Sequence, residues 1–140
     1  MSSPLAIREA LAAYLDNNAV EGLRAGTDPG SLANPPVALV LPAQGLYVDY
    51  TAALNPRLYD VVVRIVILVS RASERAGFAL LDGFLAPYGA TSIAAAILAN
   101  DTLSGACDYI IPVQANGPTP ISFAGIEYFG AEIICRAAAE

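Results

Sequence analysis

Residues Arg57–Arg71 read RLYDVVVRIVILVSR, and this stretch decides the fold. Valine or isoleucine occupies every second position from residue 61 to residue 69, and all of these side chains are β-branched. Successive side chains of a β-strand point to opposite faces of the sheet, and β-branched residues pack well on such a surface. The pattern therefore predicts a long strand with one face turned to a hydrophobic core.

The opposite face of this predicted strand is also unusually apolar. Val62, Val66 and Leu68 share it with Arg64. A sheet face that is open to water normally carries more polar residues than these. We therefore expect something to cover this face, either another part of the same chain or a neighbouring subunit.

The composition favours a subunit of an assembly. The 140 residues suit a single domain, residues 1–140, with one core. Hydrophobic residues make up 56% of the chain and charged residues only 14%, which leaves few charges to coat the surface of a monomer. The net charge of −6, with seven Arg and no Lys, argues against general nucleic-acid binding, because such binding needs clustered positive charge.

Cysteine usage indicates a reducing compartment. Cys107 and Cys135 are the two cysteines, and Ser2–Arg8 lacks the basic start and apolar run of a secretion signal. We therefore expect two free thiols in the cytosol. A disulfide would require that the later strands place the two cysteines side by side.

One segment is long and apolar enough to raise the question of a membrane. Ala76–Ala99 carries Asp82 as its only charge, and its length would span a bilayer. Gly77, Gly83 and the sequence PYGAT at residues 87–91 interrupt it. We expect two short buried helices here and no contact with a membrane.

Helices are predicted where an oxygen-bearing side chain precedes an apolar stripe, because such a side chain caps the first turn. The first helix runs to about residue 18, the second follows residue 73, and the third covers residues 93–98. The expected caps are Ser3, Ser73 and either Thr91 or Ser92. The expected buried stripes are Leu5, Ile7, Leu11, Tyr14 and Leu15 in the first helix and Phe78, Leu81, Phe84 and Leu85 in the second.

Strands are predicted at residues 37–41, 46–50, 58–70, 106–113 and 125–137, with irregular connections at Gly22–Pro36 and Asn116–Pro120. In the fourth of these strands the alternation places Tyr109, Ile111 and Val113 on the face of Cys107, with Ile110 opposite. The order of elements predicts an α+β fold: a mostly antiparallel sheet of about four to five strands, with the helices packed on one face.

The residue types that are missing exclude most common enzyme chemistry. Without histidine and lysine the chain has no Ser-His-Asp arrangement, no Schiff-base nucleophile and no phosphate-binding Gly-Lys loop. Two pairs of carboxylates remain, Asp49 with Asp60 and Asp101 with Asp108. We interpret Asp49 and Asp60 as solvated or Arg-paired strand residues and Asp101 as part of a helix end. We expect no catalytic residue, no cofactor and no metal site.

Arg64 is the most informative single residue, because it lies within a strand that is otherwise suited to burial. Its stem could cover apolar neighbours while the guanidinium reaches water, or the guanidinium could bind a carboxylate of another subunit. The strand pattern yields a set of candidate interface residues: Tyr47, Asp49, Tyr59, Val62, Arg64, Val66, Leu68, Glu132 and Arg136.

The order of segments resembles the tail terminator proteins of long-tailed bacteriophages, the lambda tail-terminator-like family. The segments that carry the resemblance are LAIREALAAYL at residues 5–15, PPVALVLP at 35–42, the strand at 61–69, SIAAAIL at 92–98, DTLSG at 101–105 and GIEYFGAE at 125–132. The likeness covers nearly the whole chain, and it lies in pattern and order because the family has no fixed chemical motif.

The resemblance implies a non-enzymatic virion protein, made in the host cytoplasm, that forms a six-membered ring on the last ring of the tail tube. The ring would bind the tail tube protein, stop tube growth and offer a surface to the head-completion proteins. Genomic DNA would pass through its channel without specific binding, and the acidic balance suits this role.

Three alternatives stay open at this point. One is another head-to-tail connector subunit, a tail completion or head stopper protein. The second is a small-ligand-binding domain that uses an apolar cleft between helices and sheet, and the third is an enzyme that uses carboxylates.

Overall fold

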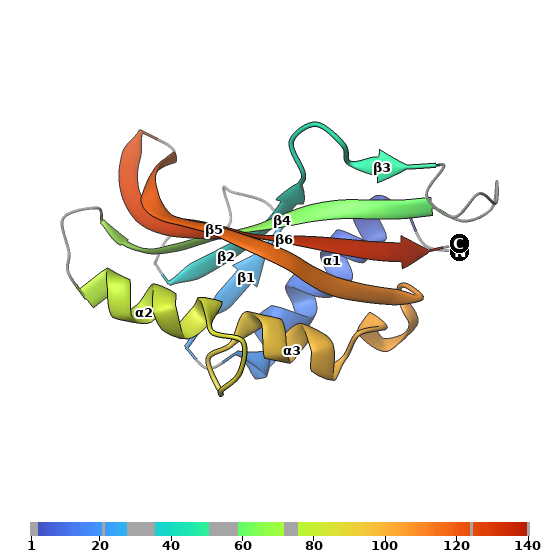
Figure 1. The fold of residues 1–140 in the computed structure, drawn as a ribbon, viewed down its shortest axis with the longest axis horizontal. Coiled ribbons are helices and arrows are strands. Elements are labelled where there is room, and N and C mark those ends of the chain that lie inside the picture. The colour runs from blue at the N-terminus through green and yellow to red at the C-terminus, as the bar shows by residue number, and fades with distance from the viewer. Residues whose placement is uncertain are drawn as a thin grey trace.

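Strand β4 (Tyr59–Arg71) lies in the middle of the sheet in the computed structural model, as its pattern predicts (Figure 1). The structure describes residues 3–20, 22–27, 36–50, 59–71, 76–123 and 125–139. The helices within these ranges are α1 (Pro4–Tyr14), continued by a π-helical turn (Leu15–Ala19), α2 (Ala76–Leu85), α3 (Ile93–Ala99) and a 3₁₀ turn (Leu103–Gly105). The other strands are β1 (Arg24–Gly26), β2 (Val37–Pro42), β3 (Val48–Asp49), β5 (Tyr109–Phe123) and β6 (Ile126–Ala139).

The strands form one sheet in the order β1-β2-β4-β6-β5, and β3 also pairs with β4. Every pairing is antiparallel except that of β1 with β2, which is parallel. Helices α1, α2 and α3 all lie on the same side of this sheet (Figure 1). The predicted α+β fold with helices on one face is confirmed, and the sheet has six strands where four to five were expected.

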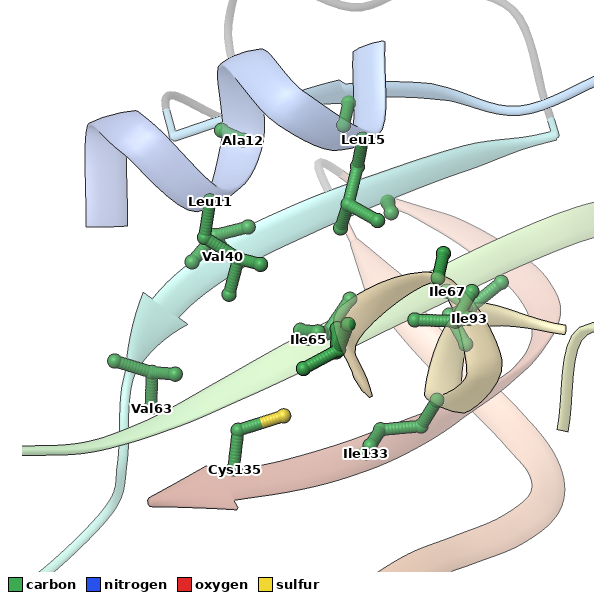
Figure 2. Close-up of a cluster of buried hydrophobic side chains, with 14 of the residues drawn as sticks. Leu11, Ala12, Leu15, Val40, Val63, Ile65, Ile67, Ile93, Ile133 and Cys135 are labelled. Carbon is green, nitrogen blue, oxygen red and sulfur yellow. The ribbon is translucent and has the colours of Figure 1, made fainter. Parts of the chain in front are cut away.

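The core lies between the helices and the sheet (Figure 2). Val63, Ile65 and Ile67 of β4 point into it together with Leu11 of α1 and Ile93 of α3, and each of these side chains is completely buried. Burial of one such side chain stabilises the fold by about 1.5–3 kcal/mol. These side chains of the helices and the sheet thus pack together in one continuous buried cluster.

The predicted helix starts are confirmed where the structure describes them. The hydroxyl of Ser3 accepts a hydrogen bond from the Ala6 N–H at 3.0 Å, and that of Ser92 accepts one from the Ala95 N–H at 3.0 Å. Ser73 and most of the Gly22–Pro36 connection lie outside the described residues. The buried stripes are correct except at Leu5 and Phe78, which are about half exposed.

Three strand predictions were wrong. The Gly22–Pro36 connection contains the short strand β1, whose three residues are too few to show a pattern. Residues 116–120, expected as a loop, continue strand β5, which pairs with β6 on both sides of a register shift between Asn116 and Thr119. Of the strand predicted at residues 46–50, only Val48 and Asp49 pair with β4.

The structure shows which face of β5 turns to the core, a question that the sequence pattern left open. Ile110 is completely buried beside its cross-strand partner Ala137, whereas Tyr109, Ile111 and Val113 are 42–55% exposed. Both faces of this segment carry apolar residues, so alternation alone could not decide which of them faces the core.

None of the described helices is long and apolar enough to cross a membrane. The apolar segment 76–99 is divided as predicted, because α2 ends at Leu85 and α3 begins at Ile93.

Candidate functional site on the open face of the sheet

The sheet face that points away from the helices is called the open face here. On β4 it carries the even-numbered side chains from Asp60 to Leu68, because successive residues alternate in direction. Arg64 lies directly opposite Ile134 of β6, and Val62 lies opposite Arg136. The open face thus contains most of the predicted interface residues.

One end of the open face is covered by the chain itself. Val66 and Leu68 are 5% and 3% exposed, and they pack with Val37 and Leu39 of β2. Ile121 and Tyr128 complete this cluster from the ends of β5 and β6, which curve up over the sheet on the side away from the helices (Figure 1). The predicted cover exists at this end, and it is supplied within the subunit.

Arg136 connects three strands at the other end of the open face. Its Nε donates to Asp60 Oδ2 at 2.7 Å, and its Nη2 donates to Asp49 Oδ2 at 3.1 Å. The pKa of Arg136 is raised, chiefly by the hydrogen bond to Asp60. The interpretation of Asp49 and Asp60 as Arg-paired carboxylates is confirmed, and Arg136 fastens β3 to β4 and β6.

Arg64 has much weaker bonding than Arg136. Its Nη1 lies 3.7 Å from Glu132 Oε2, a separation longer than a hydrogen bond, and the other oxygen of Glu132 accepts from Asn116 at 3.0 Å. The Nε atom of Arg64 is buried and has no hydrogen-bond partner within the described part of the chain. A buried donor without an acceptor costs about 1–3 kcal/mol, so the position of Arg64 is unfavourable for the folded subunit.

A groove of about 350 Å³ lies beside Arg64. Residues 43–47 form one wall as a hook that leaves the sheet and returns to it. The Ala43 N–H bonds to the Val62 carbonyl at 3.2 Å, and the Val62 N–H bonds to the Tyr47 carbonyl at 2.8 Å. The groove is lined by Ala43, Gln44, Leu46, Val62, Arg64, Glu132, Ile134 and Arg136.

Two predicted interface residues do not belong to the open face. The Tyr47 hydroxyl accepts a hydrogen bond from Arg8 Nε at 2.8 Å, and both Tyr47 and Tyr59 pack against the core on the helix side. The pKa of Tyr59 is raised, first by burial and then by the nearby Tyr47. Placing these tyrosines with Arg64 was therefore wrong, because they lie on the opposite side of the sheet.

The prediction missed exposed apolar residues on β5. Tyr109 and Ile111 lie opposite Ala138 and Arg136 and so share the open face, and they are 45% and 42% exposed. A signal was present in the prolines at positions 112, 118 and 120, because proline lacks an N–H donor and is found mainly in edge strands. β5 is indeed the last strand in the sheet order.

The two thiols are free and buried, as expected. Burial is the main cause that raises the pKa of Cys107 to about 11 and that of Cys135 to about 12. Thiols with such pKa values are protonated and weakly nucleophilic at neutral pH. Within the ranges that the structure describes, no cluster of three or more metal-ligating side chains occurs.

Comparison with protein-family models and with curated proteins gave no match to this chain.

Proposed function

We propose that this protein is a structural subunit that assembles with copies of itself. The observation that carries the proposal is the open face of the sheet. It holds exposed apolar side chains together with Arg64, whose guanidinium makes one long ion pair among the described residues and has one unsatisfied donor there. The helix side of the sheet already forms a complete core. At the groove end of the open face, by contrast, apolar side chains stay exposed to solvent and add little to the core of a single subunit.

The physical argument rests on the free energy of exposed apolar surface. Tyr109 and Ile111 are more than 40% exposed on the open face, and Leu46 of the hook is 53% exposed beside it. Removing apolar surface from water is favourable by about 25 cal/mol per Å². Association that covers this face would recover that free energy and supply Arg64 with an acceptor.

A non-enzymatic role agrees with the side chains available. The chain lacks histidine and lysine, and three carboxylates of the open face, Asp49, Asp60 and Glu132, lie beside arginines. Carboxylate oxygens that already face arginine side chains are poorly placed to accept a proton from a substrate.

The resemblance to tail terminator proteins suggests where such an assembly acts. We propose a ring, with six subunits as in that family, at the head-proximal end of a phage tail tube. The ring ends tube growth, contacts the tail tube protein on one side and the head-completion proteins on the other, and belongs to the virion. Genomic DNA passes through the channel, and the net charge of −6 favours its passage over its retention.

A second candidate is a small-ligand-binding domain, and the groove beside Arg64 is the observation that favours it. With a volume of about 350 Å³ and two arginines in its lining, the groove fits a small anion. A ligand-binding domain of this kind would stay a monomer or dimer at every concentration. Another head-to-tail connector subunit would form a ring but would not stop the growth of tail tubes.

The test measures the mass of the purified protein by sedimentation velocity and its shape by negative-stain electron microscopy. Both measurements are made on the protein alone and after mixing with polymerising tail tube protein. We expect rings, either free or seated at tube ends, and tubes that stop growing. Tail tube protein alone is the control, and it should continue to elongate. A protein that stays monomeric alone and leaves tube growth unchanged would refute the proposal.

A further inference from the structure

Asn116 and Gly117 lie at an irregularity in the edge strand β5. The register of β5 against β6 shifts between Asn116 and Thr119, so that Gly117 and Pro118 together lie opposite Ala131. An extra residue of this kind is left out of the regular ladder and bends its strand. β5 is the last strand in the sheet order, and both Asn116 and Gly117 are exposed. The peptide bond between them is therefore open to solvent and less constrained than the bonds of a regularly paired strand.

The side-chain amide of Asn116 has a polar neighbour on each side. Gln114 Nε2 donates to its Oδ1 at 3.1 Å, and its own Nδ2 donates to Glu132 Oε1 at 3.0 Å. A donor at Oδ1 stabilises the negative charge that develops on this oxygen when a nucleophile attacks the amide carbon. The backbone nitrogen of Gly117 can close a five-membered ring on that carbon, and glycine carries no Cβ atom to hinder the approach.

We propose that Asn116 is a site of spontaneous deamidation in the folded protein, and that Gln114 promotes the reaction. The Gly117 nitrogen loses its proton to hydroxide and attacks the side-chain carbon of Asn116. A new C–N bond closes a succinimide ring, the bond from that carbon to Nδ2 breaks, and ammonia leaves with a proton taken from water. A water molecule then opens the ring to aspartate or isoaspartate. The net reaction consumes one water and releases one ammonia, with no oxidation or reduction.

The product disrupts a contact between β5 and β6. Asn116 lies directly opposite Glu132 in the register. Aspartate has no N–H₂ group, so the hydrogen bond to Glu132 is lost and two carboxylates face each other, which is destabilising in a strand pair. Deamidation therefore loosens the sheet at this point. The reaction needs neither a second copy nor a tail tube, so the inference does not depend on the proposed function.

The test follows the full-length folded protein during long incubation at neutral pH, with peptide mass spectrometry that distinguishes asparagine, aspartate and isoaspartate. Asn100 is the internal reference, because the side chain of the following Asp101 hinders ring closure. Asn116 should react about tenfold faster than Asn100 or more, which corresponds to a barrier lower by about 1.4 kcal/mol. Gln114→Leu removes the donor to Oδ1 and should slow the reaction of Asn116 about threefold or more.

The same measurement in urea is the control, because the unfolded chain does not hold Gln114 against Asn116. Wild type and Gln114→Leu should then react at equal rates. If Asn116 stays intact in the folded protein but reacts readily in urea, the proposal is overturned. Equal rates of the two folded proteins overturn the role of Gln114. Asn116→Asp reproduces one product and should lower the urea midpoint of unfolding, and an unchanged midpoint overturns the loosening of the sheet.

Discussion

The thiol of Cys135 shows how strongly its surroundings control a single group. Its side chain is completely buried opposite Val63 in the core between sheet and helices (Figure 2). Loss of solvation disfavours the thiolate, and this raises the pKa from 9.0 to about 12. A side chain in this state behaves as a small hydrophobic residue.

The raised pKa of Cys135 predicts a loss of stability at alkaline pH. The folded pKa lies above the unfolded value, so the stabilisation is complete below about pH 9 and disappears as the pH approaches 12. The loss from this thiol should be about 1.4 kcal/mol for each pH unit in that window. Urea unfolding at pH 8, 9, 10 and 11 measures it, and Cys135→Ala should show a shallower decline, to which Cys107 and Tyr59 still contribute through their raised pKa values. Equal slopes for the wild type and the variant would contradict the prediction.

Replacing Arg136 should lower the free energy of unfolding for a different reason, because it leaves a buried carboxylate without a partner. Asp60 is only 9% exposed, and Arg136→Gln removes the donor at 2.7 Å from its oxygen. The expected loss is about 1–3 kcal/mol in the free energy of unfolding, measured with urea. Arg24→Gln makes the same change in an exposed pair, Arg24–Asp16 at 3.8 Å, and should cost less than about 0.5 kcal/mol. Similar losses in the two variants would show that Arg136 adds nothing beyond a surface ion pair.

At the scale of elements, the pairing of β4 with β6 depends on one close approach. The register shifts between Leu68 and Ser70, and here Gly130 of β6 meets the β4 backbone. A Cβ atom added at Gly130 would overlap the carbonyl oxygen of Ile67. Any larger residue must push the two central strands apart.

Gly130→Ala should therefore destabilise the protein by about 1–3 kcal/mol or more, because overpacking against backbone cannot be relieved by a change of rotamer. Thermal and urea unfolding measure the effect. Gly83→Ala is the matched control: its Cβ would meet the side chain of Thr91 at 3.0 Å, and alanine favours the helix. We expect that control to be close to neutral, and a neutral Gly130→Ala variant would disprove the close approach.

The elements that the sequence predicts well are those with a strong local signal. β4 has nine residues of alternating β-branched pattern, and the caps of α1 and α3 form within three residues of the helix start. β1 has three residues, and it is a strand because β2 lies beside it. β5 continues through glycine and three prolines because β6 supplies a long partner, which is information from outside the segment.

At the scale of the whole molecule, the sequence indicates that apolar surface is in excess but not how the chain distributes it. The ends of β5 and β6 curve over Val66 and Leu68, and no local pattern reports a contact between positions so far apart in sequence. Tyr59 lies two positions before Val61 in the same strand. The alternation of side chains therefore already placed Tyr59 on the core face, and this position was predictable from the sequence. Tyr47 was not predictable in the same way, because the hook at residues 43–47 interrupts the alternation of the strands on either side.

A sheet that ends in a long edge strand is at risk of aggregation through that edge. The outer edge of β5 could pair with a strand of another molecule, and such pairing can start an amyloid-like aggregate. The three prolines of β5 have no amide hydrogen to donate to such a strand. The Ile110 N–H already donates to the Asp101 carbonyl at 2.7 Å. The free edge of the sheet is therefore a poor template for a further strand, and this protects concentrated protein from aggregation through β5.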